Sequence, residues 1–264
     1  MSTDSRSVDC IRKGHRADIV FNNPRRHNAM SLSMWAQLDD ALQVLASDLA
    51  VRAVVFSGAG EKAFVSGADI SEFDTQRGDK GAVAEYNRIS EAADLAVCEF
   101  PKPTIAKIRG YCLGGGLGLA LGADIRICSE DSSFAIPAGK LGLGYNFHDA
   151  SRLLRLLGPS RASELLYTAK RIGAEEALQI GLVNQVVPAP DIDAVVDEMV
   201  ETVTSNAPLT LAAFKAASIE WMKQDNQIDH ESVSKLAAAC YASADYAEGR
   251  MAFGEKRKPV FNGK

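Results

Sequence analysis

Short apolar runs alternate with segments of helical periodicity along the first half of the chain, and this alternation limits the fold more than any other feature. Each run contains β-branched residues, and turn residues close the first two, which is typical of buried strands. Because strands joined by helical crossovers pair in parallel, the pattern predicts an α/β fold with a parallel sheet. The predicted strands cover 17–21, 51–56, 104–108 and 124–128, and the predicted helices cover the segment behind Ser31, 80–97 and 114–121.

The last third of the sequence is predicted to be mainly helical. One short apolar run at 182–187 interrupts the helical pattern that follows Pro159. Pro208 stands where a first-turn proline starts a helix. Since no repeat, low-complexity tract or flexible linker is visible, we expect an α/β core over residues 1–195 and a helical region over 196–264.

The charge and hydropathy of the chain exclude several classes of protein. The 264 residues carry 29 basic and 34 acidic side chains, a net charge of −5, with no block of like charge that suits nucleic acid or an anionic membrane. No apolar run reaches the roughly 18 to 20 residues that span a bilayer, and the polar N-terminal segment lacks the apolar stretch of a secretory signal. We therefore expect a cytoplasmic protein with no nucleic-acid or membrane partner.

The five cysteines are widely spaced and form no zinc-type pair or cluster, so the sequence predicts reduced thiols and no metal site. They are Cys10, Cys98, Cys112, Cys128 and Cys240.

Two glycine-rich segments, 63–70 and 110–118, lie where a strand gives way to a helix. The first N–H groups of a helix have no intrahelical acceptor and carry partial positive charge, so they can hold an anion or an oxyanion. The alternative for each segment is a tight turn with close helix packing. A dinucleotide-binding motif is disfavoured, because 58–63 is not followed by a periodic helix and the glycines after Leu113 carry one residue too many.

Four motifs occur in order, at 23–30, 66–70, 110–116 and 181–184. Together they resemble the crotonase superfamily, also called the enoyl-CoA hydratase/isomerase family, and the resemblance runs from about residue 8 to Arg257. It implies a spiral core of ββα units, a helical C-terminal trimerisation region, and a homotrimer or a homohexamer built as a dimer of trimers. It also implies acyl-CoA thioester substrates, with coenzyme A as part of the substrate and no separate cofactor.

The resemblance assigns roles to individual residues. The backbone N–H groups of Ala68 and Gly115 correspond to an oxyanion hole around the thioester carbonyl, which agrees with the helix-start argument. A second set corresponds to residues that bind or cover coenzyme A, whose phosphates suit basic groups. This set is Arg25, Arg26, His27, Ala29, Ser66, Asp69, Ile70, Phe253 and Lys256.

The sequence departs from a hydratase at the two positions where the resemblance places glutamates. Gly118 and Ala138 occupy these positions, and neither side chain can move a proton. Tyr145 falls where methylmalonyl-CoA decarboxylase of the superfamily also has Tyr-Asn and naphthoate synthase has an aspartate. Decarboxylation needs no glutamate base, because the oxyanion hole accepts the enolate that CO2 leaves behind. We therefore favour decarboxylation of a malonyl-type thioester, although the decarboxylase has a His where this chain has Ala68.

Two alternatives remain open. His148 and Asp149 can form a proton-moving pair, so that water and Asp149 support hydration, or they can form the exposed cap of a helix that begins near Ser151. Tyr145 can likewise be a half-buried aromatic without a chemical role. Loss of both glutamates is also compatible with a protein that binds acyl-CoA without turnover.

Overall fold

The computed structural model describes residues 6–72, 80–223 and 227–264. A six-stranded sheet has the order β1-β2-β3-β5-β7-β10, and a four-stranded sheet has the order β4-β6-β8-β9. The strands are β1 (Ser7–Lys13), β2 (Arg16–Asn22), β3 (Ala53–Gly58), β4 (Ala63–Val65), β5 (Thr104–Ile108), β6 (Tyr111–Leu113), β7 (Ile125–Ser129), β8 (Ser133–Ala135), β9 (Ile172–Gly173) and β10 (Gln185–Val187).

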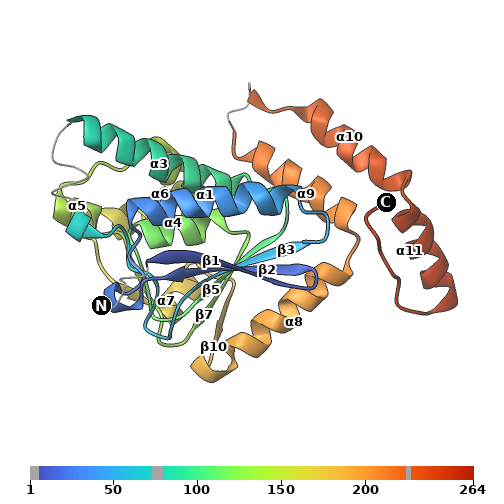
Figure 1. The fold of residues 1–264 in the computed structure, drawn as a ribbon, viewed down its shortest axis with the longest axis horizontal. Coiled ribbons are helices and arrows are strands. Elements are labelled where there is room, and N and C mark those ends of the chain that lie inside the picture. Colours follow the sequence, from blue (N-terminus) through green and yellow to red (C-terminus); the bar gives the residue numbers. More distant parts are fainter. Residues whose placement is uncertain (1–5, 73–79, 224–226) are drawn as a thin grey trace.

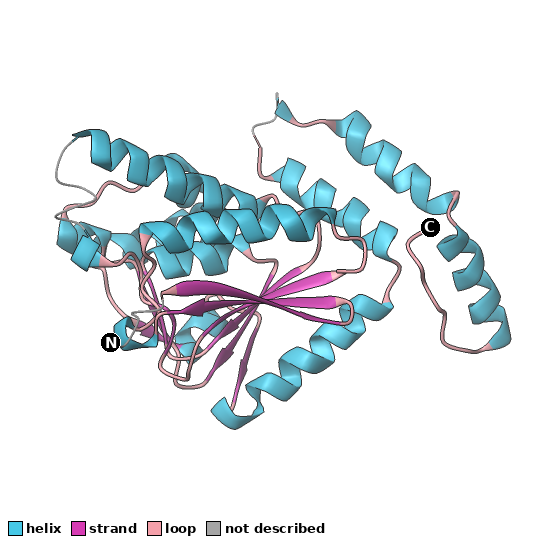
Figure 2. Cartoon of the chain, in the orientation of Figure 1, coloured by secondary structure: helices cyan, strands magenta, loops and turns pink. Residues whose placement is uncertain are grey.

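Helices cover both faces of the larger sheet (Figures 1 and 2). Helices α1, α3, α4 and α6 lie on one face, α8 lies on the other, and α10 and α11 stand apart from the sheet. The α-helices are α1 (Leu32–Ser47), α3 (Lys80–Cys98), α4 (Gly115–Gly122), α5 (Ala138–Leu141), α6 (Phe147–Thr168), α7 (Ala174–Gln179), α8 (Ile192–Ser205), α9 (Pro208–Trp221), α10 (His230–Tyr241) and α11 (Ala244–Glu255). Short 3-10 helices are η1 (Pro24–Arg26), η2 (Ile70–Glu72) and η3 (Ala189–Asp191).

The predicted α/β class and the predicted parallel pairing are confirmed. Strands β2, β3, β5, β7 and β10 pair in parallel, and only the outer strand β1 runs antiparallel to its neighbour in this sheet. The second sheet was not predicted from the apolar runs. Its strands β4, β6 and β8 have three residues each, which is too short for a periodic pattern to stand out in the sequence.

Helix α1 shows how local signals position an element of the core. The Ser31 hydroxyl accepts a hydrogen bond from the Met34 N–H at 3.3 Å, which caps the helix as the sequence predicts. Its apolar residues recur at helical spacing, so one face enters the core. The buried residues are Met34, Trp35, Leu38, Leu42 and Leu45.

Helix α8 crosses the boundary expected at residue 195. Its Ile192, Val196 and Val200 are buried against a cluster that includes Val55 and Ile105 of the sheet. A helix that buries its apolar stripe against a sheet belongs to the same core. The packed core therefore extends at least to the end of α8, and α10 and α11 form the outlying C-terminal part.

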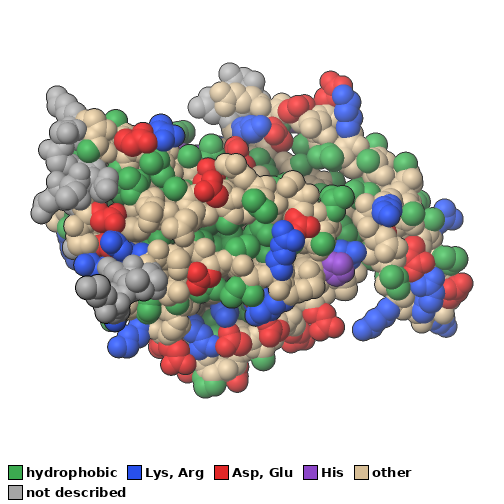
Figure 3. Space-filling model, viewed as in Figure 1, with side chains coloured by type: hydrophobic (Ala, Val, Ile, Leu, Met, Phe, Trp, Pro, Cys, Tyr) green, Lys and Arg blue, Asp and Glu red, His purple; other side chains and the backbone are tan. Residues whose placement is uncertain are grey.

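The surface and the cysteines add two observations. Acidic and basic side chains are interspersed on the face drawn in Figure 3, in agreement with a sequence that has no block of like charge. Among the described residues, no helix is long and apolar enough to cross a bilayer. All five cysteines are free, in agreement with the predicted reduced thiols.

A close approach between α4 and β4 joins the smaller sheet to the helical layer. A Cβ atom on Gly116 would lie 2.0 Å from the backbone oxygen of Val65, which no real contact allows. The Gly114 N–H donates to the Ala135 carbonyl of β8 at 2.9 Å and fixes the turn that precedes α4. Only glycine at position 116 therefore lets the first turn of α4 lie against β4.

We predict that Gly116→Ala lowers the free energy of unfolding by about 2 kcal/mol, because the added methyl group forces α4 away from β4. Gly118→Ala is the matched control, since its Cβ would meet only the Asp94 Oδ1 atom at 3.9 Å. Urea denaturation of both variants measures the difference. Equal stability of the two variants would contradict the role given to Gly116.

Candidate active site

A cavity of about 850 Å³ lies beside the start of α4. Its wall is formed by the loop at 66–68, the inner face of α3, the first turn of α4, and the segment 136–149. These segments are distant in sequence, and packing of α3, α4 and α6 brings them together (Figure 1). Every residue that the sequence analysis placed at a reaction centre lies in this wall, namely Ala68, Gly115, Gly118, Ala138, Tyr145, His148 and Asp149.

The two predicted oxygen-binding donors come from adjacent loops. A Cβ on Gly67 would lie 3.9 Å from the Gly115 nitrogen, so the loop before Ala68 touches the start of α4. Backbone bonds hold that loop on both sides of Ala68, because the Met30 N–H donates to the Gly67 carbonyl and the Asp69 N–H donates to the Met30 carbonyl, each at 2.8 Å. The backbone around Ala68 is thus paired with Met30, which lies just before α1, in a single parallel β-bridge.

Within the described part of the chain, the N–H groups of Ala68 and Gly115 donate to no protein acceptor. Gly115 is the first residue of α4, where a helix leaves its N–H groups free and carries partial positive charge. Both residues line the cavity. Two such donors can bind an oxygen atom that becomes negative during a reaction.

The wall next to these donors is partly aromatic. The Trp35 indole N–H donates to the Tyr86 hydroxyl at 3.2 Å, and both side chains are buried at the cavity. The Trp35 ring lies 3.6 Å from the place of a Cβ on Gly115. An apolar surface therefore adjoins the donors and can pack against a substrate chain.

A buried carboxylate that sequence reasoning missed also lines the cavity. Asp94 of α3 has a side chain 14% exposed, and its Oδ1 lies 3.9 Å from the place of a Cβ on Gly118. Asp94 bonds to Arg152 of α6, which also bonds to Asp149. Asp94 therefore places a carboxylate beside Gly118, although position 118 itself carries no side chain. The only sequence signal for Asp94 is an acidic residue in an otherwise apolar turn of α3.

Helix α6 follows Tyr145 and begins four residues before the start near Ser151 that the sequence predicts. The helix starts at Phe147, and Asn146 is its cap, since the Asn146 side chain accepts a bond from the Asp149 N–H at 2.8 Å. Asp149 is therefore not the cap, and its carboxylate faces Arg152 instead. Tyr145 is half-buried, and among the described residues its hydroxyl has no hydrogen-bond partner. Burial raises the pKa of this hydroxyl, so it stays protonated.

The group Asp94, Cys98 and His148 has donor atoms within 4.8 Å of one another, as a metal site requires. Arg152 already lies against two of these residues, with its Nη1 atom 2.6 Å from the Cys98 sulfur. Burial also raises the pKa of Cys98 to about 12, which keeps the thiol neutral. The guanidinium is therefore the cation of this cluster.

The segment predicted to contact coenzyme A is held against the Ala68 loop. The Ser66 hydroxyl donates to the Arg26 carbonyl at 3.2 Å, and the Ser66 N–H donates to the His27 carbonyl at 3.1 Å. His27 has a φ of 52° and its ring meets Tyr111 edge to face, whereas Ala29 is buried. Arg25 is exposed, and Ile70 lies in η2.

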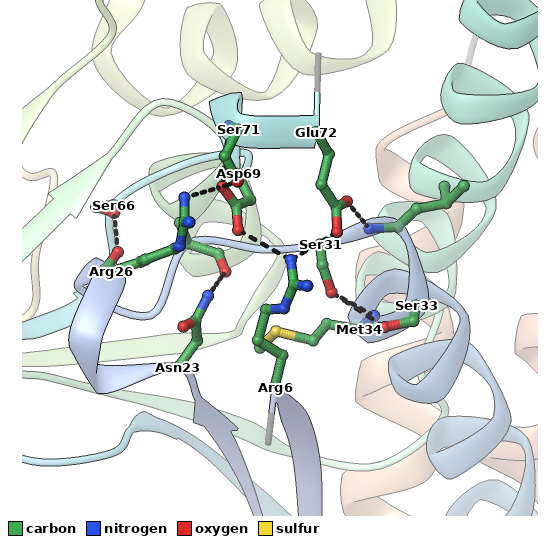
Figure 4. Close-up of polar contacts among 12 residues, drawn as sticks. Arg6, Asn23, Arg26, Ser31, Ser33, Met34, Ser66, Asp69, Ser71 and Glu72 are labelled. Carbon is green, nitrogen blue, oxygen red and sulfur yellow. Dashed lines mark hydrogen bonds and ion pairs between the residues drawn. The ribbon is translucent and has the colours of Figure 1, made fainter. Parts of the chain in front are cut away.

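The Asp69 side chain is bound by other side chains of the protein (Figure 4). Its buried carboxylate accepts bonds from the Ser71 hydroxyl at 2.7 Å, from Arg26 at 3.1 Å and from Arg6 at 3.3 Å. Burial by itself raises the pKa of Asp69, but the bonds from Ser71 and the two guanidinium groups lower it more. Asp69 thus ties the Ala68 loop to the Arg26 segment.

Phe253 and Lys256 lie elsewhere in this chain. Phe253 of α11 is 88% exposed and lines a second cavity of about 720 Å³ between α9, α10 and α11. Lys256 caps the C-terminus of α11 with a φ of 57°. Within one chain, neither residue reaches the cavity that holds Ala68 and Gly115, and their contact with coenzyme A stays a prediction.

Known proteins were compared with this chain as a whole. A family model described as enoyl-CoA hydratase/isomerase matches residues 13–264. The short-chain-enoyl-CoA hydratase of Clostridium acetobutylicum is 35% identical over 250 residues, which are 94% of each chain. The carnitinyl-CoA dehydratase of Proteus mirabilis is 32% identical over 98% of this chain and 100% of that protein. The crystal structure of an enoyl-CoA hydratase/carnithine racemase from Magnetospirillum magneticum superposes with a TM-score of 0.92 at 34% identity, covering 97% and 96% of the two chains.

We predict that Asp69→Asn lowers the free energy of unfolding by about 2 kcal/mol at pH 7, because two guanidinium groups lose their charged acceptor. Since the folded-state pKa of Asp69 is lowered, its stabilisation is complete above the ordinary aspartate pKa of about 4 and is lost as pH falls through the folded-state pKa. Urea denaturation at pH 7 and pH 3 should therefore show a smaller difference between wild type and variant at pH 3. Asp40→Asn, at an exposed position, is the control. A stability difference between wild type and Asp69→Asn that is the same at both pH values would contradict this assignment.

Proposed function

The chain belongs to the enoyl-CoA hydratase/isomerase family of acyl-CoA enzymes, and from this premise we propose that it is a lyase that adds water to an enoyl-CoA thioester, or removes water from the corresponding 3-hydroxyacyl-CoA. The observation that carries the proposal is the cavity lined both by two backbone donors and by the carboxylates of Glu91, Asp94 and Asp149, of which Asp94 and Asp149 are bound by Arg152. In this proposal the N–H groups of Ala68 and Gly115 bind the thioester oxygen. The carboxylates supply the proton transfer that hydration needs.

The electrostatics of the cavity support hydration over decarboxylation. Asp94 and Asp149 line the wall, and Arg152, which binds both, leaves the pair with a net negative charge when all three are ionised. A malonyl-type substrate would bring its own carboxylate into this field, and like charges in a partly buried site repel. A neutral enoyl group meets no such penalty. The names of the two relatives described above, a hydratase and a dehydratase, agree with this preference.

Decarboxylation of a malonyl-type thioester is the second candidate, and Tyr145 is the observation that favours it. Tyr145 lines the cavity, and its hydroxyl stays protonated and has no acceptor among the described residues. A hydroxyl donor in that position can orient a carboxylate for departure as CO2. Binding of acyl-CoA without turnover is a third outcome that the same experiments distinguish.

The predicted contacts with coenzyme A and the predicted assembly also belong to this proposal. Arg25, Arg26 and His27 form the basic segment beside the Ala68 loop, where phosphate groups of the substrate can bind. Large apolar side chains on α9, α10 and α11 are exposed in one chain, which supports a homotrimer or a homohexamer. These side chains are Phe214, Trp221, Tyr241 and Phe253.

We predict that mass spectrometry of crotonyl-CoA after incubation with the protein shows the addition of one water. Loss of CO2 from methylmalonyl-CoA in the same panel would favour decarboxylation instead. Acyl-CoA that binds and remains unchanged across the panel would favour a binding protein.

The variant Gly115→Pro tests the oxyanion donor within this experiment. Proline is tolerated at the first position of a helix and lacks the N–H donor, so the rate should fall about 100-fold. Gly115→Ala keeps the N–H and is the matched control, since its Cβ meets Trp35 at an ordinary 3.6 Å. Equal rates for the two variants would exclude the Gly115 N–H from catalysis.

Tyr145→Phe separates the two candidate reactions. If the hydroxyl orients a departing carboxylate, the variant lowers turnover of a malonyl-type thioester at least about tenfold. If hydration is the reaction, we expect the variant to hydrate crotonyl-CoA within about threefold of the wild-type rate, because the carboxylates carry the proton. Steady-state kinetics with both substrates measure the two effects.

A further inference from the structure

We propose that Asp94 is the catalytic acid–base of this site and that Arg152 is its positioning residue. The inference deepens the proposed function and rests on it, because it assigns the proton transfer of hydration to one carboxylate. Neither residue stands in a motif that the sequence analysis singled out. The assignment comes from how α3, α4 and α6 meet at the cavity.

The position of Asp94 relative to the oxygen-binding donors is the first argument. Gly115 and Gly118 are one turn apart on the same face of α4, and both line the cavity. Three residues of helix advance about 4.5 Å along the axis. The Asp94 carboxylate lies next to Gly118, at 3.9 Å from the place of its Cβ. In an enoyl thioester, C2 and C3 follow the carbonyl carbon directly, so they fall within this one-turn distance when the oxygen sits at the Gly115 N–H.

The space in front of Asp94 is the second argument. Gly118 has no side chain, and the nearest heavy atom that a Cβ there would meet is the Asp94 oxygen itself. A larger side chain at position 118 would stand between the carboxylate and the cavity. The glycine therefore leaves Asp94 as the acidic group that borders the cavity beside α4.

Arg152 fixes the carboxylate in place. Its Nη2 atom donates to Asp94 Oδ2 at 2.5 Å and also to Asp149, and its Nη1 atom lies 3.4 Å from Asp94 Oδ1 and 3.5 Å from the Gly118 carbonyl oxygen. The Arg152 side chain is only 5% exposed. A planar guanidinium with several fixed partners restricts the rotation of the carboxylates that it holds. Asp94 is therefore held with its Oδ1 edge toward Gly118.

The surroundings of Asp94 also suit proton transfer. Burial raises the pKa of Asp94, the Arg152 charge opposes this shift, and the Asp149 charge adds to it. The other titratable groups that face it are Cys98 from α3 and His148 from α6. A carboxyl group with a raised pKa exchanges a proton with water or carbon more readily near neutral pH than an ordinary aspartate does.

The proposed hydration consumes one water molecule and leaves Asp94 unchanged at its end. The water oxygen forms a bond to C3 while one of its protons passes to the Asp94 carboxylate, and the C2=C3 electron pair moves onto the thioester oxygen as an enolate. The enolate then collapses, and C2 takes the proton from the Asp94 carboxylic acid. Asp94 returns to its ionised form, and the product differs from the substrate by one water.

The test compares Asp94→Asn with Glu85→Gln, an exposed acid-to-amide change on the same helix. With crotonyl-CoA, we expect Asp94→Asn to lower kcat at least about 100-fold while the Kd for the thioester stays within about twofold. Glu85→Gln should retain the wild-type kcat. An Asp94→Asn variant that is folded by circular dichroism and keeps more than a third of the wild-type kcat overturns the proposal.

A second pair of variants gives an independent test that survives a folding defect of Asp94→Asn. Asp94→Glu keeps a carboxylate at this position, and Asp94→Gln is its uncharged counterpart of the same size. A kcat for crotonyl-CoA at least about tenfold higher for the glutamate variant supports proton transfer by this carboxylate. Equal kcat values for the two folded variants overturn it.

Failure of this inference and failure of the proposed function give different results. Wild-type protein that hydrates no enoyl-CoA overturns the proposed function. Wild-type protein that hydrates crotonyl-CoA, with Asp94→Asn as active as Glu85→Gln, leaves the function standing and overturns the role of Asp94 alone.

Discussion

The contact between the first turn of α4 and strand β4 is the constraint on which the site depends. Because Gly116 has no Cβ, the helix can approach the Val65 carbonyl closely enough for its N-terminus to reach the Ala68 loop. The same placement turns Gly115 toward the cavity and sets Gly118 against α3. The missing side chain of Gly116 thus positions a backbone donor, and the missing side chain of Gly118 leaves the space before a carboxylate open. Rigid elements hold such groups more accurately than loops do.

Arg152 organises the polar side of the cavity. It is one of few buried cations described in the chain, and it binds two carboxylates that come from different helices. A buried charge is stable only when it is paired and hydrogen-bonded, so α3 and α6 are joined through this cluster as well as through apolar contacts. The cluster also gives Asp94 and Asp149 unequal surroundings, because Asp94 is the more buried of the two. Two acids of different exposure beside two N–H donors form a site suited to moving one proton.

A second polar tie supports the other side of the cavity. Hydrogen bonds among Asp69, Ser71, Arg26 and Arg6 connect η2, η1 and the residue before β1 around the Ala68 loop. The loop therefore has little freedom to turn the Ala68 N–H away from the cavity. The basic segment at 25–27 is held by the same hydrogen bonds, since Arg26 binds Asp69. The proposed sites for the thioester oxygen and for the coenzyme A phosphates are therefore fixed relative to each other.

The sequence by itself determined the elements whose signals are local. Apolar runs marked strands β2, β3, β5 and β7 but not β1, Ser31 marked the start of α1, and the glycine motifs marked the turns that carry Ala68 and Gly115. It also determined that positions 118 and 138 hold no carboxylate. Only the tertiary structure decided that Asp94 lies beside Gly118, because that contact joins α3 to α4 and is fixed by Arg152, 58 residues further along the chain. Periodicity reports which face of a helix is buried, but it cannot report which distant residue that face will meet, since the meeting depends on the packing of the whole layer.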